Sequence, residues 1–159
     1  QVVRIIKEQS FMGFRAFFAH ERNTTSALAL EDSTVAALPL DIMAELIEMH
    51  HSITDYFITI LATTLGETDN RFVTITQKHI RGRLAETILA LKANYGIEND
   101  DKTLNVIMNR YDLASLSNMS TSNAIRTLSS FASEGLIEIS GRKIRILSEE
   151  ELAKISRLG

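Results

Sequence analysis

The chain has 159 residues and carries 17 Lys and Arg against 20 Asp and Glu, a formal net charge of −3. Hydrophobic residues make up 45% of it, which is enough for a packed core and excludes a wholly disordered chain. The sequence has no cysteine, which excludes disulfides, thiolate zinc sites, cysteine nucleophiles and cysteine-ligated iron–sulfur clusters. Since no stretch is long and apolar enough to span a bilayer and no signal peptide is visible, we expect a cytoplasmic protein.

The first 40 residues have the pattern of β-strands. β-branched residues dominate 2–6, and two short apolar stretches at 26–30 and 34–38 fit strands joined by a turn. These strands are too few to close a barrel, so we expect the chain to begin inside a larger β domain. Pro39 ends this region, and Asp41 is the expected N-cap of the helix that follows.

The next segment predicts a long helix with a narrow apolar seam. Its apolar positions alternate in steps of three and four over three heptads, a spacing typical of a helix that packs along a partner helix. A core helix inside a monomer is the alternative. The predicted dimer-interface residues are Ile58, Leu61, Leu65, Thr68, Phe72 and Ile75.

A second helix is predicted from Ile80 to Tyr95, with Gly96 as its C-terminal stop. A polar loop at 98–102 and a short strand at 103–108 follow.

Two further helices are separated by a tight turn. The first is predicted at 112–116, and the second runs from 121 to about 134 between the N-cap Ser120 and the terminating Gly135. One face of the second helix is polar, with Ser122, Arg126, Ser129 and Ser133; the other is predicted to be apolar, with Ala124, Ile125, Leu128, Phe131 and Ala132. This is the helix-turn-helix layout, in which the start of the second helix contacts base edges in the major groove.

A β-hairpin with a basic tip is predicted next. Strands at 137–139 and 142–146 flank Gly141, and Ser148 begins a capping box that opens a last helix. Between residues 120 and 147 there are four Arg and Lys against two Glu, a net charge of +2 in a chain of net charge −3. This local excess of positive charge is typical of a small DNA-binding module.

Five segments of the C-terminal half carry a family resemblance: 82–89, 109–114, 120–128, 135–137 and 141–144. Together they resemble the C-terminal half of the cyclic-AMP receptor and fumarate–nitrate regulator (Crp/Fnr) family of bacterial transcription factors. Upstream, residues 9–13 and 29–33 resemble the later strands of the cyclic-nucleotide-binding roll of that family.

The resemblance implies an α+β fold in three parts. Residues 1–50 would form the C-terminal part of an effector-sensing, cyclic-nucleotide-binding-type β-roll, 51–79 a long dimerisation helix, and 80–159 a winged helix-turn-helix DNA-binding domain. It also implies a homodimer whose partners are double-stranded DNA, RNA polymerase and a small-molecule effector.

The DNA-binding residues are carried over from the family pattern. Arg126 would bind guanine, Arg110 would touch phosphate, and Arg142 and Lys143 would lie beside the backbone. The start of the helix would face the groove through Ser120, Thr121, Ser122 and Asn123. Ser122 stands where the family commonly has Glu, so the operator is expected to differ from the usual half-site.

The resemblance also places the effector pocket, at Phe14, Arg15, Asn23, Thr24 and Thr68. Gly13-Phe14 and Asn23-Thr24 stand where cyclic-AMP binders have Gly-Glu and Arg-Ser. Because the arginine that binds the phosphate is absent, we do not expect cyclic AMP to be the effector. No cofactor is identified; haem, ligated by His20, His50, His51 or His79, is the one alternative.

Two other classes of function compete with DNA binding. An enzyme is disfavoured, because Glu48 and His51 supply only one half of a di-iron motif and no nucleophile–base set is present. A dimeric protein-interaction module, in which Arg126 forms only a salt bridge, is the stronger alternative. The polar face of the second helix favours DNA over a protein partner.

Overall fold

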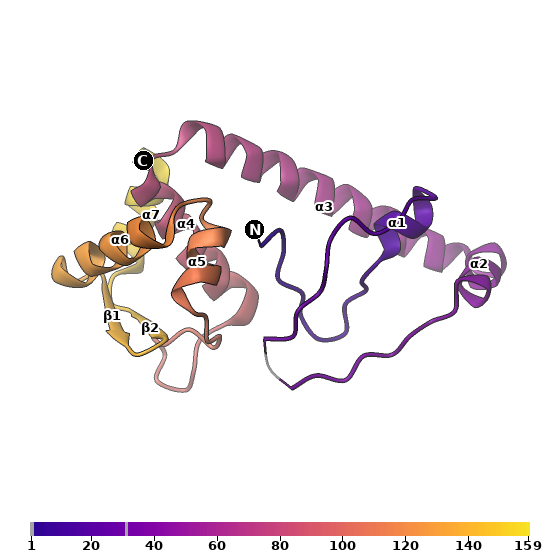
Figure 1. Cartoon of the computed structure of the whole chain (residues 1–159), viewed down its shortest axis with the longest axis horizontal. Helices are drawn as coiled ribbons and strands as arrows, with labels where there is room; N and C mark the ends of the chain where they lie inside the picture. Colours follow the sequence, from indigo (N-terminus) through magenta and orange to yellow (C-terminus); the bar gives the residue numbers. More distant parts are fainter. Residues whose placement is uncertain (1, 31) are drawn as a thin grey trace. The chain divides into compact units, whose positions relative to one another are not determined.

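The computed structural model describes residues 2–30 and 32–159 (Figure 1). Gln1 and Glu31, which belong to the predicted β-roll segment, lie outside the described residues. The helices and strands, in chain order, are α1 Phe14–Phe18, α2 Leu40–Met49, α3 His51–Gln77, α4 Ile80–Tyr95, α5 Arg110–Leu116, α6 Thr121–Ser133, β1 Ile137–Ser140, β2 Lys143–Ile146 and α7 Glu149–Leu158.

The chain forms two compact units. One contains residues 6–70, and the other contains the described residues 2–5 together with 71–159. Helix α3 contributes residues to both units. The predicted domain limits of 1–50, 51–79 and 80–159 remain sequence-based predictions.

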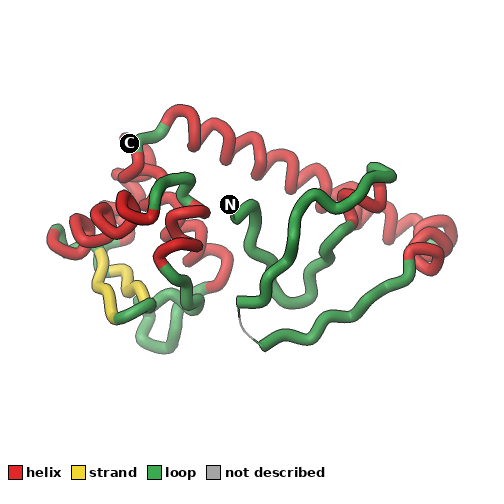
Figure 2. The backbone as a smooth tube through the Cα atoms, viewed as in Figure 1, coloured by secondary structure: helices red, strands yellow, loops and turns green. Residues whose placement is uncertain are grey.

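The described residues among the first 40 do not form the expected strands. Apart from α1, the described residues before α2 are loop (Figure 2). A strand exists only when its backbone pairs with a neighbour, and the described part of this segment contains no such ladder. The apolar side chains of Leu28, Val35 and Leu38 are consequently exposed.

Phe57 on α3 organises the unit of residues 6–70. Its ring is buried and lies 5.1 Å from Phe11, 5.4 Å from Phe18 and 6.0 Å from Phe14, measured between ring centroids. Aromatic pairs at these separations stabilise beyond the area that they bury. This cluster fixes α1 and the preceding loop on α3.

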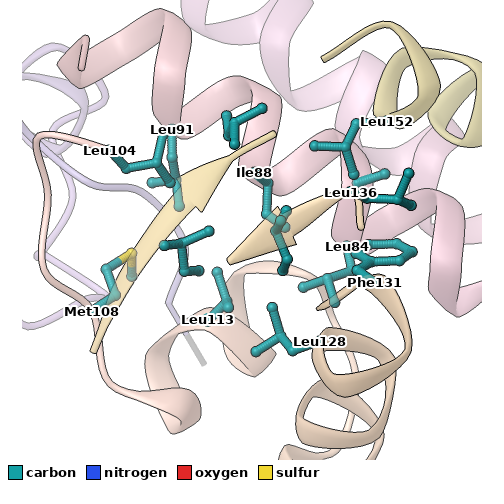
Figure 3. Close-up of a cluster of buried hydrophobic side chains, with 14 residues drawn as sticks. Leu84, Ile88, Leu91, Leu104, Met108, Leu113, Leu128, Phe131, Leu136 and Leu152 are labelled. Atoms are coloured by element: carbon teal, nitrogen blue, oxygen red, sulfur yellow. The ribbon is translucent and has the colours of Figure 1, made fainter. Parts of the chain in front are cut away.

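The core of the other unit is built by α4, α5, α6, the hairpin and α7. Figure 3 shows Leu84 and Ile88 of α4 meeting Leu128 and Phe131 of α6, with Leu113 of α5 beside them. All five side chains are essentially inaccessible to solvent, and burying each contributes about 1.5–3 kcal/mol. This core sets the orientation of α6, the second helix of the predicted helix-turn-helix.

The predicted hairpin is formed as an antiparallel pair of β1 and β2. Ile137 lies opposite Ile146 and Ile139 opposite Ile144, which places the isoleucines on the core side. Gly141 begins the two-residue loop with φ of 59°, a left-handed conformation that glycine adopts without strain. The strand expected at 103–108 is reduced to isolated bridges at Thr103 and Leu104.

Two predicted N-caps differ from the structure. Helix α2 begins after Pro39, so Asp41 lies in its first turn and does not cap it. Ser148 precedes α7 but its side chain accepts no capping hydrogen bond, so the predicted capping box is not formed.

Candidate nucleic-acid interface

Helices α5 and α6 form the predicted helix-turn-helix. The N-cap side chain of Asn109 accepts a hydrogen bond from the Asp112 backbone N–H, so α5 begins two residues earlier than predicted. In the turn, Asn118 has φ of 49° and the Met119 N–H donates to the carbonyl of Ala114 at 3.0 Å. The turn is therefore tied to α5, which fixes the point at which α6 starts.

The first turn of α6 is polar. Ser120 accepts a hydrogen bond from the Asn123 backbone N–H at 3.2 Å, and its hydroxyl lies 3.0 Å from that of Ser122. Thr121 and Asn123 are half-buried, whereas Ser122 is exposed. The structure thus brings the four predicted groove-facing residues together at a helix N-terminus, where backbone N–H groups favour anions such as phosphate.

Arg126 lies one turn further along α6 and is exposed. Its Nη2 donates to Asn123 Oδ1 at 3.3 Å, so its guanidinium points back toward the first turn. In the described part of the chain, no carboxylate pairs with Arg126. Its charge is therefore available to an external acceptor.

One residue of the predicted apolar face is misplaced. The buried face of α6 consists of Ala124, Thr127, Leu128 and Phe131. Ile125, predicted to be buried, is 48% exposed. It lies with Ser122, Arg126 and Ser129 on what we call the exposed face of α6. Periodicity gives the direction of each side chain, but it does not show where the buried face ends.

Arg81 fixes the C-terminal end of α6. Its guanidinium donates to both carboxylate oxygens of Glu134 at 2.8 and 2.7 Å and to the Ser130 hydroxyl at 2.6 Å. It also lies 4.9 Å from the centroid of the Phe131 ring. Hydrogen bonds from Arg81 and Ser130 lower the pKa of Glu134 to about 2. No local sequence pattern predicts this contact, because its partners belong to different helices.

Arg110 contacts the hairpin. Its Nη2 donates to the carbonyl of Gly141 at 2.8 Å, linking the first residue of α5 to the loop of the hairpin. The resemblance assigned Arg110 to phosphate. Here it also positions the hairpin, which lies beside the helix-turn-helix as the wing does in winged-helix proteins.

The cations of the wing, defined here as residues 137–146, are mostly paired within the chain. Lys143 lies 2.7 Å from Glu98, and Arg145 lies 3.1 Å from Glu138. Arg142 is exposed, and among the described residues it has no ion-pair partner. The wing therefore offers one unpaired cation at its tip and two whose charge is balanced nearby.

Asp100 adds a third carboxylate to this region, 3.6 Å from Arg145. Its pKa is lowered to about 2, chiefly by hydrogen bonds from the Thr103 hydroxyl and backbone and from the Lys102 backbone, with a smaller effect of Arg145. These hydrogen bonds to the Asp100 carboxylate hold residues 100–103 in a turn before the wing.

The predicted effector-pocket residues that have recorded contacts pair with different neighbours, and the pocket itself stays a prediction. Phe14 packs on Phe57, and Arg15 forms an ion pair with Glu21 at 2.9 Å. Thr68 lies three turns along α3 from Phe57, where its hydroxyl donates to the Thr64 carbonyl. A separate apolar cavity of about 350 Å³ is lined by Phe11, Leu38, Met43, Leu46, Ser52, Ile53, Tyr56 and Phe57.

The predicted dimer seam is largely exposed. Ile58, Leu65 and Phe72, spaced seven residues apart on α3, are 58%, 62% and 68% exposed. Leu61 and Ile75 are half-buried, and Thr68 is exposed. A row of large apolar side chains in contact with water is typical of a surface that packs against another helix.

Two other kinds of feature are absent from the described residues. None of the described helices has the length and apolar character needed to cross a membrane. Likewise, no three His, Asp or Glu side chains in residues 2–30 and 32–159 are grouped as a metal site.

The C-terminal part of the chain is similar to a known family of DNA-binding domains. Residues 82–155 match the model of the Crp-like helix-turn-helix domain. Over 158 residues the chain is 23% identical to a CRP-like cAMP-activated global transcriptional regulator of Mycobacterium tuberculosis, which covers 98% of this chain and 70% of that protein.

Two solved structures have a similar fold. FixK2 from Bradyrhizobium japonicum matches with a TM-score of 0.67 and 15% identity, over 73% of this chain and 58% of that chain. A Crp/Fnr-family transcriptional regulator from Thermus thermophilus matches with a TM-score of 0.56 and 21% identity, over 61% and 50%. The chain thus spans less than two thirds of either structure. These likenesses confirm the predicted class, an α+β chain in which part of a cyclic-nucleotide-binding-type domain precedes a long helix and a winged helix-turn-helix.

Proposed function

The chain belongs to the Crp/Fnr family of transcriptional regulators and is not an enzyme, and from this premise we propose how it acts. It is a homodimer that binds a palindromic DNA operator through α6. An effector other than cyclic AMP controls this binding, and RNA polymerase is the partner on the promoter.

The exposed face of α6 is the observation that carries the proposal. Arg126 lies there without a carboxylate partner in the described part of the chain, one turn after a polar helix N-terminus. Arginine binds O6 and N7 of guanine through two hydrogen bonds, an interaction that contributes about 1–3 kcal/mol of discrimination. The first turn of α6 and Arg142 at the wing tip then contact the phosphates on either side.

The exposed seam of α3 supports a homodimer. Two copies packed along Ile58, Leu65 and Phe72 remove three large apolar side chains of each chain from water. A two-fold axis along the seam supplies one α6 to each half-site, and this matches the symmetry of a palindrome.

The proposed effector is not cyclic AMP, although the name of the relative from M. tuberculosis describes activation by cAMP. Asn23 stands where cyclic-AMP binders have the arginine that binds the phosphate, and Arg15 is paired with Glu21. A cyclic phosphate would therefore lack its main charge-assisted contact. Calorimetric titration of the full chain with cyclic AMP is expected to give no heat of binding, and measurable binding would contradict this part of the proposal.

The experiment that tests DNA binding is selection from a random double-stranded pool. The wild-type chain is expected to enrich a palindrome with a guanine in each half-site. In the Arg126→Ala variant the preference at that guanine is lost. Arg157→Ala, on α7, is the matched control because it removes an exposed arginine from another helix of the same unit.

Salt dependence distinguishes DNA from a protein partner. Contacts with phosphates give a steep negative slope of log K against log salt, with about 0.9 for each phosphate. The absence of enrichment, or a flat slope, would instead favour the protein-interaction module.

A further inference from the structure

We propose that Ile125 is a specificity-determining residue that contacts the C5-methyl group of a thymine in each half-site. This inference rests on the proposed DNA-binding function and extends it to a residue that the family pattern did not assign. Helical periodicity predicts that Ile125 is buried, whereas in the structure its side chain is exposed.

The position of Ile125 on α6 is the first argument. Its immediate neighbour Ala124 is fully buried, whereas Ile125 is 48% exposed. Ser122 lies one turn before it and Ser129 one turn after it, and both are exposed. Ile125 is thus the one large apolar side chain among the described residues of the exposed face of α6.

The chemistry of the major groove is the second argument. Thymine is the base that presents a methyl group there, and apolar side chains contact this group. Isoleucine is stiff at χ1, so its methyl groups hold a defined direction on a helix without further contacts. An exposed isoleucine on a helix in the major groove therefore prefers thymine to cytosine, which has an amino group and no methyl group.

The adjacency of Ile125 and Arg126 gives the register. Neighbouring residues on a helix are about 100° apart and 1.5 Å apart along the axis, so both reach the same short stretch of DNA. The thymine contacted by Ile125 therefore lies within one or two base pairs of the guanine bound by Arg126.

Replacement of thymine by deoxyuridine tests this inference, because it removes only the methyl group. In the operator selected by the wild-type chain, each thymine is replaced in turn. We expect one position in each half-site, next to the guanine that Arg126→Ala no longer selects, where the replacement weakens binding. The expected loss is about fourfold per half-site, the effect of one buried methyl group.

The same measurements on Ile125→Ala complete the test. Alanine is a good helix former at an exposed position, so the variant is expected to fold and still bind DNA. Its affinity should be the same for thymine and deoxyuridine at that position. Leu158→Ala, at the exposed end of α7, is the control that removes a comparable side chain and should retain the full effect of deoxyuridine.

The outcomes separate the two proposals. If an operator is selected but deoxyuridine has no effect at any thymine next to that guanine, the role proposed for Ile125 is wrong. The proposal of DNA binding then still stands. A deoxyuridine effect that persists in Ile125→Ala also overturns the role of Ile125. If no operator is selected, both proposals fail together.

Discussion

Arg81 of α4 and Glu134 at the C-terminal end of α6 form an ion pair in which two guanidinium nitrogens donate to the two carboxylate oxygens, at 2.8 and 2.7 Å. The same guanidinium lies over the ring of Phe131, a core residue of α6. This pair thus ties the helix proposed to bind DNA to the helix that directly follows α3. Through these two contacts, Arg81 fixes the C-terminal end of α6 against α4.

The pair predicts a specific loss of stability in acid. The pKa of Glu134 is lowered to about 2 from an ordinary 4.5, so the unfolded chain binds this proton more readily than the folded chain. The contribution is therefore fully present above about pH 4.5 and is lost as the pH falls toward 2. Since both side chains are partly exposed, Glu134→Gln is expected to lower the free energy of unfolding by only about 0.5–1 kcal/mol at pH 7.

Urea unfolding of the wild type and Glu134→Gln between pH 3 and pH 7 measures this difference, which should be constant from pH 7 to about pH 4.5 and shrink below that pH. Glu150→Gln, which removes an exposed carboxylate of α7, should show no such trend. A difference that is constant with pH would refute the assignment of the pH dependence to this ion pair.

The contact between Glu98 and Lys143 predicts that a substitution can strengthen DNA binding. Both oxygens of Glu98 accept hydrogen bonds from the lysine, at 2.7 and 3.0 Å. Glu98→Gln weakens this pairing and makes Lys143 available to a phosphate. Affinity for the selected operator should rise at low salt, and the slope of log K against log salt should become steeper by about one.

A change of net charge alone would also raise affinity, so this prediction needs a matched variant. Glu149→Gln makes the same charge change and also breaks an ion pair, with Lys92 on α4 at 2.5 Å. It should leave the slope nearly unchanged. Equal slopes for the two variants would show that Lys143 does not contact DNA.

Replacing either of two helical glycines by alanine is expected to change stability, in opposite directions for the two positions. A Cβ atom on Gly82 would lie 2.8 Å from the backbone carbonyl carbon of Gly159, whose oxygen accepts a hydrogen bond from the His79 N–H. Gly82→Ala is therefore expected to destabilise the packing of α7 on α4 by about 1–3 kcal/mol. Gly66 in α3 has open space at this position, so Gly66→Ala should stabilise its helix by about 1 kcal/mol.

Thermal unfolding of the two variants beside the wild type checks this pair of predictions. The melting temperature should fall for Gly82→Ala and rise for Gly66→Ala. A rise for both would mean that the end of α7 moves aside without loss of stability.

Local chemistry explains which elements could be predicted from the sequence. Ser120 caps α6 through the Asn123 N–H, Gly96 ends α4, and Gly141 forms the hairpin loop, all as predicted. Each of these signals acts within a few residues. The strands of the first 40 residues could not be predicted in this way, because a strand depends on a pairing partner that its own residues do not specify.

Only part of the candidate interface could be predicted from the sequence, because only some of its contacts are local along the chain. The polar first turn of α6 and Arg126 follow from helical spacing. The ion pairs Arg81–Glu134 and Lys143–Glu98 join residues 53 and 45 positions apart, so no local pattern marks them. Helical spacing predicts Ile125 on the core face because its direction on the helix borders that of Leu128. Only packing decides which border residue becomes exposed.

The apolar row on α3 predicts that a single charge prevents dimerisation. Leu65 lies at the centre of this row and is 62% exposed. Across a two-fold seam, Leu65→Glu would bring two carboxylates together in a desolvated contact, which is strongly unfavourable. Sedimentation equilibrium should give a dimer for the wild type and a monomer for the variant. Affinity for the full palindrome should then fall to that for an isolated half-site.

The control for this prediction lies on the same helix. Thr63→Glu places the same charge two residues away at an exposed position on the opposite side of α3 from the seam, so this variant should remain a dimer. Circular dichroism of both variants verifies that α3 is still formed. If Leu65→Glu remains a folded dimer that binds the palindrome like the wild type, the seam is not the dimer interface, because no dimer packed along it could accommodate two buried, unpaired carboxylates.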